Sequence, residues 1–171
     1  MLEVIKKRRS IRLYLKKPVE REKIKEVLKA AMFSPSAMHR RPWEFVVVED
    51  ESLKKQLSKA TPWASFAANA PVILVVLGDC KLSRLWREDC SIVGAYIYLE
   101  ATAQGLGTCW IQVGESKTPD GRDSEEYVRK LLNIPENFRV LALFPIGYPG
   151  EKKEEHNESE FEKRKVHWGK W

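Results

Sequence analysis

Residues 72–77 read Val-Ile-Leu-Val-Val-Leu, an unbroken apolar run rich in β-branched side chains. A run of this length and composition predicts a strand at the centre of a sheet, and it is too short to cross a bilayer. The next long apolar segment, residues 88–104, is hydrophobic on several sides, which predicts a buried helix lying partly against a second subunit. Gly105 and Gly107 are expected to end this helix.

The flanking sequence predicts further helices and strands on both sides of this centre. A short helix is expected to end near Arg9, and a second one begins after Pro18 and stops before Pro35. Helices are also expected over 52–59, 63–68 and 124–133, the last capped by Asp123 or Ser124, with strands over 45–48, 108–113 and 140–146. No strand leads into a G-x-G-x-x-G turn, which argues against a Rossmann fold. We therefore expect one α+β domain over residues 1–171, with a sheet covered by helices.

Composition limits the compartment and the class of protein. Three cysteines, Cys80, Cys90 and Cys109, are too few for a disulfide framework and lack zinc-site spacing, so no metal is expected. The first ten residues contain no apolar stretch of a secretory signal. These features favour a cytoplasmic protein with reduced thiols and no membrane anchor.

Positive charge is concentrated at the start of the chain. Residues 1–29 contain eleven Lys or Arg and four Glu, whereas the whole chain has a net charge of +6. Such a segment is either a solvated helix face or a site for an anion, which includes phosphate and nucleic acid. A nucleic-acid-binding module would require aromatic residues among the basic ones and a recognisable motif. Neither is present, so we expect no nucleic acid partner.

Three short segments carry the chemistry. Residues 8–12, Arg-Arg-Ser-Ile-Arg, place guanidiniums and a hydroxyl together, which suits a phosphomonoester but is also typical of a basic helix end. Residues 34–43, Ser-Pro-Ser-Ala-Met-His-Arg-Arg-Pro-Trp, combine stiffening prolines with small side chains, as an ordinary loop or a flat-ring site would. Residues 103–111 contain glycines that either stop a helix or let backbone N–H groups approach a planar ligand.

In this order, and with residues 144–149 and a closing Trp168 and Trp171, these segments resemble the nitroreductase family of FMN enzymes. The resemblance extends from Ile5 to Trp171. It implies a three-layer α+β fold with a mixed, mostly antiparallel sheet flanked by helices. It also implies a homodimer with FMN at the interface and a C-terminal extension that wraps the partner subunit.

The resemblance also assigns roles to individual residues. Arg8 and Ser10 correspond to the phosphate and ribityl end of FMN, and Arg12 to the pyrimidine edge of the flavin. Residues 35–37 correspond to the loop that packs on the flavin from the other subunit, and the backbone near 112–114 to a donor toward flavin N5. The expected cofactor-binding residues are Arg8, Arg9, Ser10, Arg12, Pro35, Ser36, Ala37, His39, Gln112, Val113, Gly114, Lys152, Lys153 and His156.

Three positions depart from the family pattern. His39 and Arg41 stand where the family loop commonly has Asn and Gln, and Tyr96 replaces an Asn in the long helix. A histidine changes charge near neutral pH and can still hydrogen-bond a cofactor, although a lone histidine is more often structural. These changes bear on the acceptor more than on FMN.

The implied activity is ping-pong hydride transfer. FMN would take hydride from NADH or NADPH and pass it to a small acceptor such as a nitroaromatic or a quinone. Two alternatives use the same scaffold: a specialised flavin reaction, such as reductive dehalogenation or a dehydrogenase step, and FMN binding without turnover. The segments 58–70 and 114–122 are the expected walls of the acceptor site.

Overall fold

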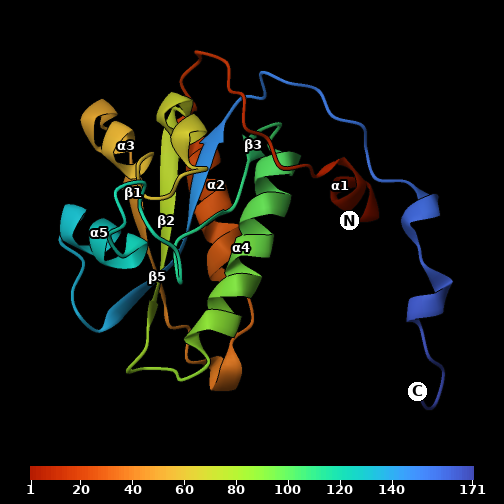
Figure 1. The fold of residues 1–171 in the computed structure, drawn as a ribbon. Coiled ribbons are helices and arrows are strands. Elements are labelled where there is room, and N and C mark those ends of the chain that lie inside the picture. Colours follow the sequence, from red (N-terminus) through yellow and green to blue (C-terminus); the bar gives the residue numbers. More distant parts are fainter.

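The computed structural model describes residues 1–171 and has three layers (Figure 1). Its centre is β2 (Val72–Asp79), which pairs antiparallel with β1 (Trp43–Val48) on one side and with β5 (Phe138–Gly147) on the other. The short strands β3 (Gly107–Thr108) and β4 (Ile111–Gln112) both pair antiparallel with β5. One parallel pairing completes the sheet, an isolated bridge from Ser10 to Thr108. The expected α+β fold, with its mostly antiparallel sheet, is confirmed.

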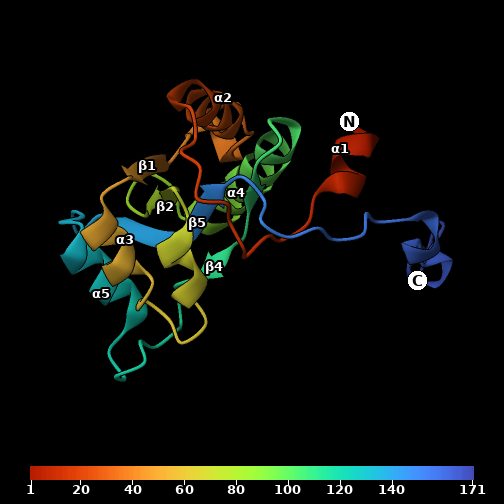
Figure 2. The same cartoon turned by 90° about the horizontal axis from the view of Figure 1, so that it is seen from above.

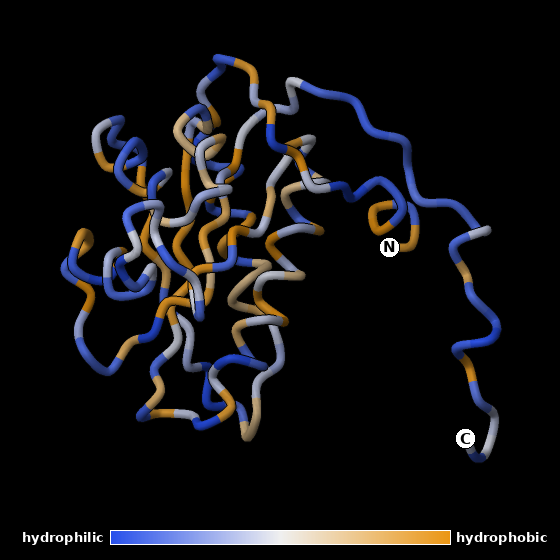
Figure 3. The backbone as a smooth tube through the Cα atoms, viewed as in Figure 1, coloured by the Kyte–Doolittle hydropathy of each residue, from blue (hydrophilic) through white to orange (hydrophobic).

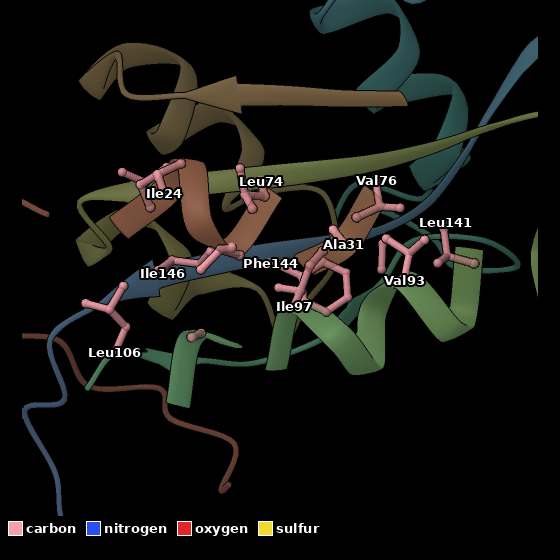
Figure 4. Packing of buried hydrophobic residues seen from close by; sticks show 14 of the residues in the cluster. Ile24, Ala31, Leu74, Val76, Val93, Ile97, Leu106, Leu141, Phe144 and Ile146 are labelled. Atoms are coloured by element: carbon pink, nitrogen blue, oxygen red, sulfur yellow. The ribbon is translucent and has the colours of Figure 1, made fainter. Parts of the chain in front are cut away.

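Alternate residues of β2 supply the two cores. Leu74 and Val76 point to the face covered by α2 (Arg21–Met32) and α4 (Trp86–Ala103), where they join a buried cluster that includes Phe144 (Figure 4). Ile73 and Val75 point to the opposite face, which is covered by α3 (Glu51–Leu57), α5 (Ser124–Leu131) and the 3₁₀ turn η2 (Ser65–Asn69). Side chains in a strand alternate between faces, so an all-apolar strand must be buried on both.

One predicted strand differs from the structure. The strand expected over 108–113 is interrupted between β3 and β4, because the backbone N–H of Trp110 donates to the hydroxyl of Tyr98 at 2.6 Å. The long apolar helix is confirmed as α4; its Ile92 and Ala95 are exposed in this single chain, and its contact with a second subunit stays a prediction. At the start of α5, Asp123 rather than Ser124 is the cap, since its carboxylate accepts from the Glu126 N–H.

The end of α4 brings the N-terminal motif to the sheet. Gly105 has φ +73°. Its backbone N–H donates to the carbonyl of Thr102, and the backbone N–H of Leu106 donates to the carbonyl of Ala101. This pair of hydrogen bonds is the Schellman motif that ends a helix. Gly107 follows in β3, and an added Cβ there would lie 2.7 Å from the side chain of Ile11. Only a glycine lets residues 8–12 lie this close to β3.

Both chain ends extend away from the layered body (Figures 1 and 2). The helix α1 (Leu2–Lys7) lies beside the tail, which contains the turns η3 (Glu158–Glu160) and η4 (Lys163–Lys165). The tail is largely hydrophilic with separate hydrophobic positions (Figure 3). It also contains Trp168 and Trp171, which are 92% and 100% exposed. We call α1 and residues 151–171 together the arm. None of the helices is both long and apolar enough to cross a membrane.

Candidate functional site

The first feature of the site is the attachment of Ser10 to the sheet. Ser10 bridges to Thr108, and the N–H of Ile11 donates to the Thr108 carbonyl at 3.0 Å. The hydroxyl of Ser10 lies 3.2 Å from that of Tyr98 on α4. Burial raises the pKa of the Tyr98 phenol, so the hydroxyl stays neutral. Ser10 is thus held at a fixed position where α4, β3 and the N-terminal segment meet.

Arg8 lies beside Ser10 and is half-buried. Its guanidinium donates to Nε2 of His156 at 2.9 Å and lies over the ring of Tyr98, 5.3 Å from the centroid. Because an arginine only donates, Nε2 of His156 accepts. Nδ1 then carries the proton and donates to Glu160 at 2.7 Å. This hydrogen bond from His156 is the main cause that lowers the pKa of Glu160.

The start of the tail lies across the same motif. Lys153 donates to the carbonyl of Ser10 at 2.6 Å, and Arg9 donates to the carbonyl of Glu154. The carboxylate of Glu151 accepts from the N–H of Arg12 at 2.6 Å and from the N–H of Leu13 at 3.2 Å. The bond from Arg12 is the largest cause that lowers the pKa of Glu151. Residues 8–12 are therefore enclosed between β3 and the tail.

Four of the seven predicted basic groups come together, whereas Arg12, His39 and Lys152 do not. Arg8, Arg9, Lys153 and His156 take part in the contacts above, whereas Lys152 is exposed and forms no hydrogen bond or ion pair. Arg12 is exposed, and its guanidinium lies over the ring of Phe66 in η2, 5.9 Å from the centroid.

The loop 34–42 lies at the other end of α4. The N–H of Ala37 donates to the carboxylate of Asp89 at 2.8 Å, and Asp89 is in the first turn of α4. Tyr98 lies nine residues later on the same helix, about 14 Å along its axis at 1.5 Å per residue. Within one chain, Pro35, Ser36 and Ala37 are thus separated from the Arg8 cluster. His39 is exposed, and its side chain forms no hydrogen bond.

The third predicted segment is on β4. Gln112 is exposed, accepts from the indole of Trp110 at 2.9 Å and donates to the carbonyl of Gly114 at 3.2 Å. Val113 is fully buried in the core on the α3 and α5 face, so only its backbone can face a ligand. Trp110 packs closely on α4, because an added Cβ at Gly94 would lie 2.5 Å from its ring.

Known proteins resemble this chain over almost its whole length. The model of the nitroreductase family matches residues 5–64 and 54–148. An Archaeoglobus fulgidus protein named NADH dehydrogenase/NAD(P)H nitroreductase is 35% identical, over 99% of this chain and 98% of that one. This chain belongs to the nitroreductase family.

Other members of the nitroreductase family match over similar lengths. The solved structure of an FMN-dependent nitroreductase from Clostridium difficile superposes with a TM-score of 0.96 at 39% identity, over the full length of both chains. An iodotyrosine deiodinase from Thermotoga neapolitana is 28% identical over 94% of each chain. The family therefore includes relatives named for different reactions.

Sequence reasoning missed two residues of this site. Tyr98 contacts both Ser10 and Trp110, and Asp89 holds Ala37. Each is a polar residue within the apolar helix α4, and that is the signal by which they could have been found, since a polar group in a buried helix needs a partner.

Proposed function

We propose that this chain is an FMN-dependent oxidoreductase that uses NADH or NADPH to reduce a small electrophilic acceptor such as a nitroaromatic or a quinone. The supporting observation is Arg8, a half-buried guanidinium that forms no ion pair and lies beside the hydroxyl of Ser10. A desolvated cation without a carboxylate partner favours an anionic ligand.

The donor set fits the phosphate end of FMN. Arg8 offers a forked guanidinium, Ser10 a hydroxyl, and Lys153 and His156 come from the tail to the same place. Arginine and serine suit a phosphomonoester because they supply charged and neutral donors to its oxygens. Arg8, Ser10 and Lys153 would hold the phosphate, His156 would orient the guanidinium of Arg8 through Nε2, and Arg9 would strengthen the positive potential around it.

The remaining groups suit the ring of the cofactor. When bound, FMN would carry two electrons and a proton from the reduced nicotinamide to the acceptor. Arg12 supplies a cation for the pyrimidine edge, and its position over Phe66 limits where its guanidinium can lie. The backbone at residues 112–114 supplies N–H groups that would donate to the flavin ring. The backbone of Val113 is fixed in position because its side chain is buried in the core.

We propose a homodimer in which each site is completed by the partner. The loop at Pro35, Ser36 and Ala37 lies at the opposite end of α4 from Arg8, so it can face a flavin only in a second subunit. The face of α4 that includes Ile92 and Ala95 is exposed and apolar, as a two-fold interface requires. The arm extends from the body with two exposed tryptophans, which fits an extension that wraps the partner.

Phe66 in η2 lies beneath the guanidinium of Arg12, and Trp63 is exposed three residues earlier in the chain; we assign both to one wall of the acceptor site. Reductive dehalogenation is the second candidate reaction, supported by the deiodinase relative.

We also place the enzyme in the cytoplasm, because its three cysteines are free.

The test is a visible spectrum of the purified protein during anaerobic titration with NADH and with NADPH. We expect a yellow protein, or one that becomes yellow after FMN is added, whose absorbance near the flavin maximum bleaches on reduction. Re-oxidation by nitroaromatics, quinones and halogenated phenols then ranks the acceptor classes. A protein that stays colourless after addition of FMN would refute the proposal.

A further inference from the structure

Asp89 is a buried carboxylate with no catalytic contact. Its side chain is 3% exposed and lies in the first turn of α4, where the helix dipole favours a negative charge. One oxygen accepts from the N–H of Ala37 at 2.8 Å, and the other accepts from the hydroxyl of Ser83 at 3.2 Å. A buried charge is retained only where its partners satisfy it, and here those partners are a loop and a turn.

The loop that Asp89 contacts has an unusual backbone. Met38, His39 and Arg41 have φ values of 53°, 56° and 50°, and none of them is glycine. Such conformations persist only where the surroundings impose them, and they are typical of functional loops. Side-chain hydrogen bonds restrain the loop: Asp89 accepts from the N–H of Ala37, and the Ser36 hydroxyl accepts from the Arg41 N–H at 2.9 Å. Arg40 donates to the Leu82 carbonyl at 3.1 Å, and Arg41 donates to the Met32 carbonyl at 3.3 Å.

Of these restraints, only the one from Asp89 is partly buried, and the others are exposed. Ser36 bonds within the loop itself, and Arg40 is exposed. Asp89 therefore connects the loop to α4, the helix whose other end contacts Ser10 through Tyr98. In a homodimer, the same helix would set the position of the loop relative to the partner's site.

We propose that Asp89 is a positioning residue, which holds the strained loop 36–41 in the shape that completes the FMN site of the partner subunit. This inference rests on the proposed function. It predicts that loss of the carboxylate weakens FMN binding in the partner's site, while the Arg8 cluster of the same chain stays intact.

The first experiment measures FMN affinity of apoprotein by quenching of flavin fluorescence. Asp89→Ala is expected to weaken binding at least about tenfold, the effect of losing a hydrogen bond to a charged group. Asp89→Asn keeps one oxygen that can accept a hydrogen bond, so its affinity for FMN is expected to fall only roughly threefold. The matched control is Asp50→Ala, which removes the carboxylate that accepts from Leu53 at the start of α3. It should lower the thermal midpoint and leave FMN affinity unchanged.

The second experiment uses mixed dimers of Arg8→Ala and Asp89→Ala chains, isolated with two different affinity tags. Each parent homodimer has two defective sites. In the mixed dimer, one site combines an intact Arg8 with an intact partner loop, so it should bind FMN with wild-type affinity and a stoichiometry of one per dimer. A residue that merely stabilises its own subunit would not produce this recovery.

The outcomes separate the two ideas. If wild-type protein binds no FMN, the proposed function fails. If wild-type protein binds FMN but the mixed dimer shows no high-affinity site, or Asp89→Ala binds as wild type, the role of Asp89 is overturned. Should Asp89→Ala fail to fold, unchanged affinity in Asp89→Asn overturns it.

Discussion

The guanidinium of Arg8 donates a hydrogen bond of 2.9 Å to the imidazole of His156, although 148 positions separate the two residues. Two further contacts join the same segments. The side chain of Lys6 forms an ion pair with Glu158 at 2.7 Å, and the backbone N–H of His156 donates to the Lys6 carbonyl at 2.9 Å. The two ends of the chain thus form one unit. This unit contains Arg8, the group most suited to bind an anion. Substitutions in the tail should therefore alter anion binding at the N-terminal motif.

Two neighbouring lysines provide a matched test of the tail. Lys153→Ala removes the contact with Ser10 and should weaken FMN binding about tenfold, because a charged donor near a phosphate is lost. Lys152→Ala removes the same charge from an exposed position and should change affinity less than about twofold at physiological salt. Flavin fluorescence titration of both apoproteins measures the difference. Equal losses of FMN affinity in the two variants would mean that binding depends only on the net charge of the tail.

Glu151 should make stability depend on pH. Its pKa is held below the ordinary 4.5, first by the bond from the Arg12 N–H. A carboxyl with a lowered folded pKa stabilises the native state fully above its unfolded pKa, and this contribution is lost as the pH falls through the folded value. The free energy of unfolding of Glu151→Gln should therefore be lower than that of wild type at pH 6, and the gap should close below about pH 4. Urea unfolding at several pH values measures it. Glu155→Gln, at an exposed position, should show no such gap.

Gly107 should be sensitive to size alone. In Gly107→Ala the new methyl would meet Ile11 at 2.7 Å and push residues 8–12 off β3. We expect a loss of about 1–3 kcal/mol in unfolding free energy, as overpacking typically costs, together with weaker FMN binding. The Cβ of Ile11 is itself one of the clashing atoms, so the double variant Gly107→Ala, Ile11→Gly removes the clash and should recover affinity, as measured by the same titration. Failure to recover would place the cause elsewhere.

The exposed face of α4 predicts the subunit interface. Ile92→Asp should shift the protein toward monomer in sedimentation velocity and lower FMN occupancy together, because a buried unpaired charge opposes association. Val47→Asp on β1 is the control, because Val47 and Ile92 are exposed to similar extents, 41% and 38%, on different parts of the surface. It should remain dimeric and retain FMN. A dimeric Ile92→Asp variant would exclude this face from the interface.

Much of the fold followed from local patterns. The apolar run at 72–77 predicted the central strand, because a strand covered on both faces must be apolar at every position. Pro18 and Pro35 bounded the predicted helix that is α2, and Ile24, Val27 and Ala31 are its buried residues. The break between β3 and β4 was not visible in this way, since it depends on a hydroxyl from α4 that replaces a strand partner.

The sequence by itself predicted most of the helices and strands and favoured the segment 8–12 as an anion site, because periodicity and the clustering of arginines and serine are local properties. Only the tertiary structure decided that Lys153 and His156, and not Lys152, join Arg8. It alone placed the Pro35 loop and Ser10 at opposite ends of α4, with Asp89 and Tyr98 as their contacts. The physical reason is that contacts between distant segments depend on how layers pack, and residue order does not encode that packing locally.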